Sequence, residues 1–502
     1  MKMARLALAL LCCPSAFAAA NLVIASNVIN ANGQFVVTLN AGGSPCSSPL
    51  TPSSGVTGLT AYTQGFGTYT IASATTSGCT ITITVNANAT PTVPVFSDQG
   101  NQYLSIATGS NLTDASGNTI SATGNTTVAT TANNSTWYEM SGSTLGAHVQ
   151  LDGSPVSGTS LNSSVQWAST DGCVRFIGSS SGTGGFNLLS FNYSSGFVVF
   201  QDGAQIGSQV TTTSDTGITT YPVGGSLTGT HTYEACENLT ANGYYILYGL
   251  QLTGGMTFGS KPAAKKLMVV FGASETACQG INDSTTCVWW LLARSLGLSD
   301  LHVGQGGWPV TINTYGAAQY PTKNLRDCAK TPGGLCSGFW SLITTTPSPS
   351  ILLFVPGGND ALDSTLIGTG YSIPGYFGSD AALEFGYLVS TLNAASAKIV
   401  VVDEYYAPGI GGSPCPASAV QQPYETAWQG AAAYFAAANP TYNVHAYSTF
   451  AATCGFGTGA FQSDQLHLNN TESPVTGQQQ WANVLAPYLS TPGTAILIGA
   501  LR

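Results

Sequence analysis

Residues 267–275 read Leu-Met-Val-Val-Phe-Gly-Ala-Ser-Glu, and this stretch indicates the fold of the C-terminal half of the chain. Its first five residues form an uninterrupted apolar run, as a parallel strand buried on both faces requires. Small residues follow the run, and Ser274 comes directly after them. Similar apolar runs occur at residues 351–355 and, directly after Lys398, in the expected strand at residues 398–402. We therefore expect a parallel sheet in this half of the chain.

Stretches with helical spacing of apolar residues separate these strands. An alternation of strands and helices is typical of a doubly wound α/β domain, with three layers (α/β/α) around a parallel sheet. We place this domain at residues 261–502. The expected helices cover residues 287–298, 380–397, 424–439 and 478–489.

The N-terminal half of the chain has a different pattern, in which apolar and polar residues alternate between clusters of Gly, Asn and Ser. Residues 34–39 and 79–85 are examples. Alternation with a period of two predicts half-buried strands, and we expect two all-β sandwich domains, at residues 21–135 and 136–260. Residues 112–118 resemble the closing turn of bacterial Ig-like surface modules, so the first sandwich is expected to be Ig-like.

A hairpin signal supports the second sandwich. Asp202-Gly203 follows a run of aromatic and β-branched residues, and this dipeptide favours a two-residue turn. No repeat of fixed period occurs in the chain.

The first 20 residues have the order of a secretory signal peptide. Lys2 and Arg5 precede a short apolar run, and Ala16-Phe-Ala18 offers the small-x-small cleavage pattern. The apolar run is too short to span a bilayer, and no later apolar run reaches about 18 residues. We therefore expect a secreted, periplasmic or cell-surface protein, of bacterial origin, without a membrane span.

Ten of the 12 cysteines remain once residues 1–20 are set aside. An even number of cysteines in an exported protein predicts disulfides. We expect no metal site, because no C-x-x-C pattern occurs and the five histidines are scattered. Pairing in sequence order would keep each bridge inside one predicted domain, although the sequence leaves other connectivities open. These pairs would be Cys46–Cys79, Cys173–Cys236, Cys278–Cys287, Cys328–Cys336 and Cys415–Cys454.

Charged residues make up 7% of the chain, against about 25% in an average soluble domain. The net charge is −10, and only 12 residues are Lys or Arg. A nucleic-acid-binding protein needs a cationic surface, so we expect no nucleic-acid partner. Hydrophobic residues amount to 43%, which is enough to form buried cores.

Open α/β sheets bind ligands at the carboxyl ends of their strands, and two short stretches are expected there. If Ser274 begins a helix after its strand, its N–H faces a bound ligand. The glycines of residues 304–307 allow backbone N–H groups to approach a ligand closely. Each stretch taken alone is also an ordinary helix cap or a tight turn.

Two further stretches carry polar side chains. Asn359 follows the strand at 351–355, and its amide can donate to a developing oxyanion. Asp464 precedes His467 by three residues, so its carboxylate can turn back onto the imidazole and fix the tautomer. The remaining histidines have no acid at this spacing and are expected to be packed or surface residues. They are His148, His231, His302 and His445.

In this order, the four stretches resemble the sequence blocks of the SGNH (GDSL-type) hydrolases, over residues 266–489. Those blocks are G-D-S, a glycine turn, G-x-N-D and D-x-x-H. Ala273 stands where the family has Asp, and that Asp is not the nucleophile. The matching residues are Gly272-Ala273-Ser274, the turn at 304–307, Gly357-Gly358-Asn359-Asp360 and Asp464-Gln465-Leu466-His467.

The resemblance implies a serine esterase that acts on carboxylic esters without a cofactor. Ser274 would attack the carbonyl, His467 would act as general base, and Asp464 would hold and stabilise the imidazolium. The oxyanion would be bound by the N–H groups of Ser274 and Gly307 and by the side-chain amide of Asn359. Gly306 is the alternative to Gly307.

The order of a β-sandwich before this domain resembles bacterial carbohydrate esterases that carry a jelly roll, which would be residues 136–260. The resemblance implies removal of acetyl or similar acyl groups from a polysaccharide. Trp308 can stack on a sugar ring. A secreted lipase or general short-chain carboxylesterase is the alternative enzyme. A surface carbohydrate-binding or adhesive protein with an inactive hydrolase fold is the alternative of another class. The oligomeric state is left open.

Overall fold

The computed structural model divides into two compact units, Met1–Gly142 with Ser160–Ser163, and Ser143–Thr159 with Ser164–Arg502. The predicted boundary between the second sandwich and the α/β domain falls inside the second unit, and it stays a prediction. The structure describes residues 22–29, 35–41, 44–45, 50–63, 67–68, 70–86, 102–106, 110–113, 122–124, 129–130, 137–140, 143–153, 155–157, 165–167, 172–211, 218–281, 283–304, 310, 325–330, 348–355, 359–361, 374–402, 405–410, 420–471 and 475–490.

Two β-sheets contain most strands in the described part of the first unit, which also includes β11 (Trp137–Glu139). One has the strand order β10-β1-β2-β7-β6 with β3 beside β2, and the other has the order β5-β4-β8-β9. Ile81 and Ile83 of β7 are fully buried, as the alternation with a period of two predicts. The Ig-like assignment stays a prediction. The strands are β1 (Leu22–Ile29), β2 (Phe35–Ala41), β3 (Ser44–Pro45), β4 (Leu59–Thr63), β5 (Gly67–Thr68), β6 (Thr70–Ser77), β7 (Thr80–Asn86), β8 (Gln102–Ile106), β9 (Ala122–Gly124) and β10 (Ala129–Thr130).

An antiparallel sheet precedes the α/β region in the second unit. Its order is β12-β15-β17-β14-β13, with β16 and β18 also paired to β15. Asp202 and Gly203 both adopt positive φ angles and join β15 to β16, which confirms the hairpin turn. The jelly-roll assignment stays a prediction. The elements are α1 (Ser143–His148), β12 (Val149–Asp152), β13 (Pro155–Ser157), β14 (Val165–Trp167), β15 (Cys173–Gln201), β16 (Ala204–Thr211), β17 (Ile218–Thr253) and β18 (Thr257–Phe258).

Two of the five predicted disulfides lie among the described residues, and both are confirmed. Cys173 pairs with Cys236 across the facing strands β15 and β17, and Cys278 pairs with Cys287. Each of the other three predicted pairs includes a cysteine outside the described residues, namely Cys46, Cys336 and Cys415.

A five-stranded parallel sheet forms the centre of the α/β region, in the order β20-β19-β21-β22-β23. Apolar side chains of β19 alternate between its two faces, and all are buried. Burial on both faces explains the continuous apolar run that the sequence shows. The strands are β19 (Leu267–Gly272), β20 (Ser299–Gly304), β21 (Ile351–Val355), β22 (Lys398–Val402) and β23 (Asn443–Tyr447).

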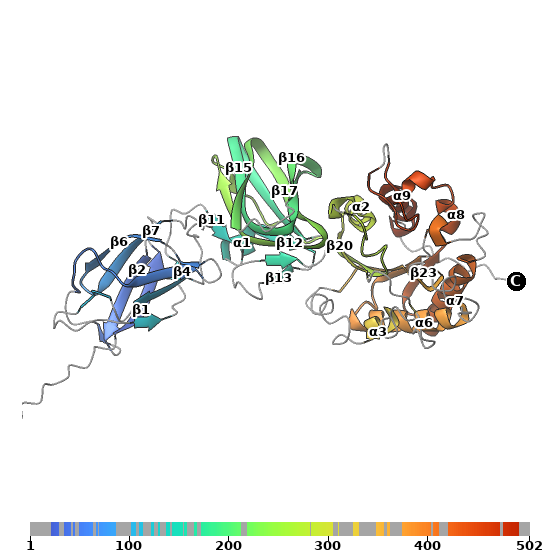
Figure 1. Ribbon diagram of the computed structural model, residues 1–502, viewed down its shortest axis with the longest axis horizontal. Coiled ribbons are helices and arrows are strands. Elements are labelled where there is room, and N and C mark those ends of the chain that lie inside the picture. Colours follow the sequence, from blue (N-terminus) through green and yellow to red (C-terminus); the bar gives the residue numbers. More distant parts are fainter. Residues whose placement is uncertain are drawn as a thin grey trace, which may run out of the picture. The chain divides into compact units, whose positions relative to one another are not determined.

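Helices cover both faces of this sheet, so the predicted three-layer α/β/α arrangement is confirmed (Figure 1). The helices α3, α6 and α7 pack on the face that carries Leu267, and α2 and α9 pack on the face that carries Met268. Burying one large apolar side chain stabilises a fold by about 1.5–3 kcal/mol, and each face buries many. The helices are α2 (Val288–Ser295), α3 (Leu325–Lys330), α6 (Pro374–Thr391), α7 (Gln422–Ala438), α8 (Phe450–Thr453) and α9 (Gly477–Ser490), with short 3₁₀ turns at Ser284–Thr286, Pro408–Ile410 and Thr458–Ala460.

The strands β20 and β23 have no counterpart among the strands that the sequence predicts. β20 carries the buried polar residues Asp300 and His302, and β23 carries Asn443 and the buried His445, so neither strand is a continuous apolar run. Both strands lie at the edges of the sheet, where only one neighbouring strand is needed. The apolar pattern therefore revealed the three central strands only.

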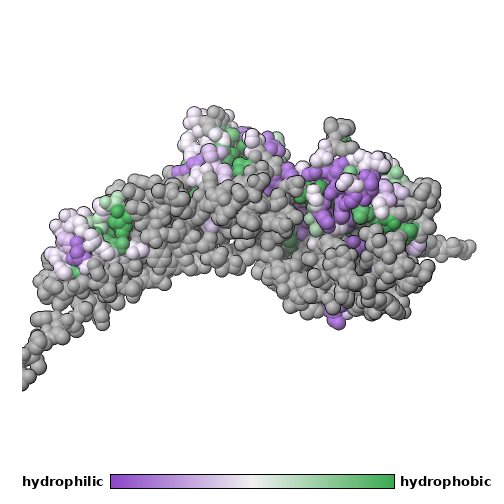
Figure 2. Space-filling model, viewed as in Figure 1, coloured by the Kyte–Doolittle hydropathy of each residue, from purple (hydrophilic) through white to green (hydrophobic). Residues whose placement is uncertain are grey.

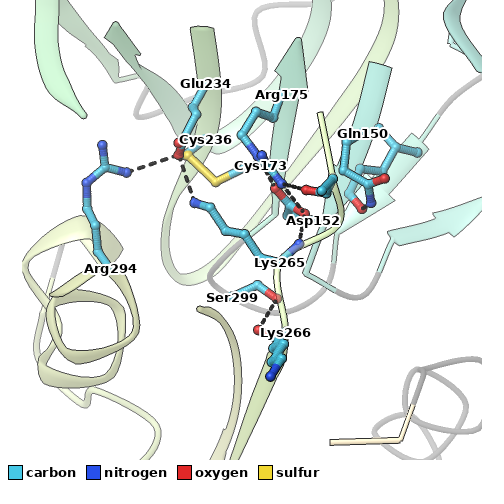
Figure 3. A network of polar contacts seen from close by, with 12 residues as sticks. Gln150, Asp152, Cys173, Arg175, Glu234, Cys236, Lys265, Lys266, Arg294 and Ser299 are labelled. Atoms are coloured by element: carbon cyan, nitrogen blue, oxygen red, sulfur yellow. Dashed lines mark hydrogen bonds and ion pairs between the residues drawn. A yellow bond between two sulfur atoms is a disulfide. The ribbon is translucent and has the colours of Figure 1, made fainter. Parts of the chain in front are cut away.

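Charged side chains connect the antiparallel sheet to the α/β region, and we call this set the junction (Figure 3). Glu234 of β17 pairs with Lys265 and with Arg294 of α2, at 3.1 and 3.2 Å. Asp152 of β12 accepts two hydrogen bonds from Arg175, at 2.6 and 3.2 Å. Each of these buried carboxylates is thus matched by cations, which offsets the cost of burying its charge.

No helix in the described part of the chain is long and apolar enough to cross a membrane. On the face shown in Figure 2, the coloured surface around the last helices of the chain is largely hydrophilic, with smaller hydrophobic areas.

Candidate active site

Ser274 follows β19 in a tight turn. The expected helix start at this position is wrong, because residues 274–280 form successive turns and the next α-helix begins at Val288. Within the turn, the N–H of Ala277 donates to the carbonyl of Ala273 at 3.0 Å, and the N–H of Gln279 donates to that of Ser274 at 3.1 Å. These bonds hold the serine in place without a regular helix.

Two glycines allow this turn to pack against neighbouring strand ends. A Cβ on Gly272 would lie 2.1 Å from the carbonyl oxygen of Val355 in β21, and a Cβ on Gly304 would lie 2.2 Å from that of Ala273. Only glycine fits such approaches. The loop after β19 is therefore held between the ends of β20 and β21.

Ser274 follows a strand at which the strand order of the sheet reverses. β19 and β21 are neighbours, the next strand in sequence after β19 lies on its other side (β20), and the next strand after β21 lies on the opposite side of the sheet (β22). In open α/β sheets, ligands bind where the strand order reverses in this way. Ser274 follows β19 and Asn359 follows β21, so both loops begin at this reversal.

The Asp464–His467 turn has the geometry that the spacing predicts. The ring Nδ1 of His467 lies 2.6 Å from Oδ2 of Asp464, and Oδ1 of the same carboxylate accepts the N–H groups of Leu466 and His467. A carboxylate only accepts, so Nδ1 carries the hydrogen and Nε2 is the atom that is left to act as a base. Gln465 adopts a left-handed backbone, with φ at 55°, which turns the aspartate back onto the ring.

Electrostatics favour the charged form of Asp464. Burial alone would raise the pKa of this carboxyl, but the hydrogen bonds from the His467 ring and from two backbone N–H groups hold the pKa below its usual value. Neighbouring groups anchor the turn: Tyr405 donates its hydroxyl to the carbonyl of Leu466, and the N–H of Gly409 donates to the carbonyl of Gln465. A negative charge thus lies fixed beside the imidazole.

A residue that the sequence analysis did not select connects the serine to the histidine. The hydroxyl of Ser274 donates to Oε1 of Glu275 at 3.1 Å, and the same oxygen lies 3.8 Å from Nε2 of His467. Ser274 and Glu275 are 4% and 9% exposed. The fold therefore brings Ser274, Glu275, His467 and Asp464 into one chain of contacts, although the serine and the histidine lie far apart in sequence.

Asn359 and Asp360 follow β21 at the same edge of the sheet. Asn359 is half-buried, and Asp360 is buried with its Oδ2 accepting the N–H of Val310 at 2.7 Å. This bond ties the chain that follows the glycine turn to the Asn359 loop. The candidate oxyanion donors Gly306 and Gly307, and the candidate sugar contact Trp308, lie outside the described residues, so their roles stay predictions.

A buried acid lies behind this loop. Burial, reinforced by the nearby carboxylates of Asp360 and Asp380, raises the pKa of Glu384 in α6 well above its usual value. Protonation of Glu384 removes the repulsion between its carboxylate and that of Asp360.

The other four histidines are packed or partly exposed residues, as predicted, but two of them also pair with an aspartate. His302 lies 2.5 Å from Asp300, and His231 lies 2.5 Å from Asp202. The first pair was detectable, because residues two apart on a strand share a face. The second depends on tertiary pairing of β15 with β17. His445 is buried, and His148 stacks on Phe258.

Two groups of potential metal ligands occur among the described residues, and each contains two cysteines. They are Cys278, Cys287 and His302, and Cys173, Glu234 and Cys236. In both groups the sulfur atoms are joined in a disulfide, which removes the thiolates that a metal would need.

Comparisons with known proteins bear on the fold. No protein-family model matches the chain, and no curated protein matches its sequence. An acetyl xylan esterase from the rumen bacterium Butyrivibrio proteoclasticus superposes with a TM-score of 0.50 at 13% identity, over 70% of this chain and 98% of that one. A family two carbohydrate esterase from Clostridium thermocellum superposes with a TM-score of 0.49 at 14% identity, over 68% of this chain and 98% of that one.

A third solved structure, a GDSL-like lipase from Bacteroides ovatus, gives a TM-score of 0.37 at 10% identity, over 63% of this chain and 82% of that one. At such identities a likeness shows the fold, and the acetyl xylan esterase carries that conclusion. The chain therefore shares its fold with this acetyl xylan esterase.

Proposed function

We propose that this chain is a secreted serine esterase that removes acyl groups, acetyl foremost, from a carbohydrate. The observation that carries the proposal is the chain of contacts from Ser274 through Glu275 to His467 and Asp464, at the strand-order reversal of a parallel sheet. A nucleophile, a base and a group that orients the base are the parts that acyl transfer requires.

The mechanism begins with proton transfer from Ser274. Its hydroxyl turns to Nε2 of His467, which takes the proton as Oγ attacks the ester carbonyl. Asp464 stabilises the imidazolium through Nδ1. His467 then gives the proton to the leaving alcohol, and water activated by the same imidazole releases the acid from the acyl-enzyme. The oxyanion would be bound by the N–H of Ser274, the N–H of Gly307 and the amide of Asn359.

Support for the substrate and the compartment comes from separate observations. The acetyl xylan esterase that shares the fold motivates an acetylated polysaccharide as substrate. Disulfides and the signal-like residues 1–20 support export to an oxidising compartment.

A panel of esters tests this proposal. We expect purified protein to hydrolyse 4-nitrophenyl acetate and acetylated xylan, to act weakly on long-chain nitrophenyl esters, and to react covalently with a fluorophosphonate probe. Ser274→Ala removes the nucleophile, so hydrolysis and labelling should both disappear.

The same panel separates the alternatives. Preference for long-chain esters would identify a lipase, and equal rates on all short esters without action on xylan would identify a general carboxylesterase. Absence of labelling and hydrolysis, together with binding of the chain to xylan or cellulose, would identify a carbohydrate-binding protein with an inactive hydrolase fold.

A further inference from the structure

Glu275 is placed where it affects both the nucleophile and the base. Its side chain is 7% exposed, and Oε1 accepts the hydroxyl hydrogen of Ser274 and lies 3.8 Å from Nε2 of His467. Its other oxygen, Oε2, is buried without a hydrogen-bond partner. Its backbone carbonyl accepts the indole N–H of Trp289, which ties the residue to α2. A buried carboxylate that lacks its own cation is costly to a fold, which suggests a use.

The serine hydroxyl has a single hydrogen, and in this arrangement that hydrogen points to Glu275. Attack requires it to move to Nε2 of His467. When the imidazole takes the proton, its positive charge forms between two carboxylates, with Asp464 at Nδ1 and Glu275 near Nε2. Within the described part of the chain, these two are the ion-pair partners of His467.

We propose that Glu275 is a second acidic partner of His467. Glu275 holds the hydroxyl of Ser274 in the resting enzyme, and its negative charge stabilises the imidazolium that forms when Ser274 is deprotonated. The inference rests on the proposed esterase function. Glu275 would add to the action of Asp464 from the opposite side of the ring. Two carboxylates around one imidazole would thus share a task that the D-x-x-H block assigns to Asp464 alone.

Two substitutions at Glu275 separate its charge from its shape. Glu275→Gln keeps the length of the side chain and an oxygen that can accept the Ser274 hydroxyl, but it removes the charge. Glu275→Ala leaves a space that a small anion can fill. Formate carries the missing charge, whereas formamide has the same shape and no charge.

We expect Glu275→Gln to lower kcat for 4-nitrophenyl acetate at least about 10-fold while KM stays within about twofold, because a charge at this distance has an effect of about that size even when water screens it fully. Formate should raise the kcat of Glu275→Ala several-fold, and formamide should not. The matched control is Glu425→Gln, because Glu425 of α7 also accepts a serine hydroxyl, from Ser448, but lies outside the chain of contacts from Ser274 to Asp464. It should keep the wild-type kcat.

The proposal is overturned if Glu275→Gln keeps or exceeds the wild-type kcat, because the charge then does not assist the step. It is also overturned if formate fails to restore Glu275→Ala, or if formamide restores it equally well, because the residue then acts by shape alone. These outcomes require an active wild type. A wild type that neither hydrolyses esters nor labels at Ser274 would instead refute the esterase function itself.

Discussion

The junction and the candidate site use the same kinds of side chain to different effect. At the junction, Glu234 has Lys265 and Arg294 within 3.2 Å (Figure 3). At the junction one carboxylate thus has two cations, whereas at the site one imidazole lies between two carboxylates, those of Asp464 and Glu275. Carboxylates that outnumber their cations are poor supports for a fold, but in the proposed mechanism they stabilise the positive charge that forms on the imidazole when Ser274 is deprotonated. The ratio of acids to cations thus distinguishes the structural network from the candidate catalytic one.

Electrostatics add a detail to this contrast. Burial would raise the pKa of Glu234, but the charges of Lys265 and Arg294 outweigh it and lower the pKa overall. Asp464 reaches a lowered pKa by hydrogen bonds from the His467 ring and two backbone N–H groups instead. If the contrast is correct, changes at Asp464 and Asn359 chiefly alter the rate, and changes at the junction chiefly alter stability.

The largest expected effect comes from Asp464→Asn. The amide keeps the shape but cannot stabilise an imidazolium and favours the wrong tautomer, so kcat should fall by about 10⁴. The measurement is hydrolysis of 4-nitrophenyl acetate, with Tm as the control for folding. A loss below tenfold would show that Asp464 is a structural partner of His467, like Asp300 beside His302.

Removal of the candidate oxyanion donor should have the next largest effect. Asn359→Ala is expected to lower kcat by about 10²–10³, because one donor to the oxyanion is lost. KM for the same ester should change little, since this contact forms only in the transition state. A rise in KM with an unchanged kcat would place Asn359 in ground-state binding instead.

At the junction we expect a change in stability only. Arg294→Ala removes a cation from Glu234 and a guanidinium that lies 3.7 Å from the Phe200 ring, so the free energy of unfolding should fall by about 2 kcal/mol. Because the pKa of Glu234 is lowered in the fold, this contribution is present above its usual value of 4.5 and is lost as pH falls further. Urea unfolding of the wild type and the variant at pH 7 measures the loss of stability, and the same measurement at pH 3.5 shows whether the loss becomes smaller at low pH. A kcat that fell with stability intact would contradict the contrast.

The smallest effect is expected at Glu384. Its pKa is raised in the fold, so the wild type loses stability as pH rises above the usual value of 4.5 and towards the raised pKa. Glu384→Gln removes this loss, and its Tm at pH 7 should exceed that of the wild type by about 2–4 °C, with the difference vanishing near pH 4. Thermal unfolding between pH 4 and pH 8 measures the trend. If the difference in Tm between the two proteins did not change with pH, the pKa of Glu384 would be the same in the folded and unfolded states, and this prediction would be wrong.

Local patterns were sufficient for much of the fold. Continuous apolar runs predicted β19, β21 and β22 because both faces of these strands are buried, and three of the four expected helices begin within two residues of α2, α7 or α9. The fourth, α6, begins earlier than expected, at Pro374. Polar edge strands and the turns after Ser274 were missed, since tertiary hydrogen bonds rather than apolar spacing define them.

By itself, the sequence determined the contacts whose partners are close along the chain. The Asp464–His467 pair and the Cys278–Cys287 disulfide required only a short turn, so residue type and spacing were enough. Only the tertiary structure decided that Glu275 lies between Ser274 and His467. That meeting depends on packing between distant segments. His467 lies in the turn before α9, Trp481 of α9 packs against Trp289 of α2, and Trp289 donates its indole N–H to the carbonyl of Glu275. No local pattern encodes such contacts, because they form only when the helices pack together on the sheet.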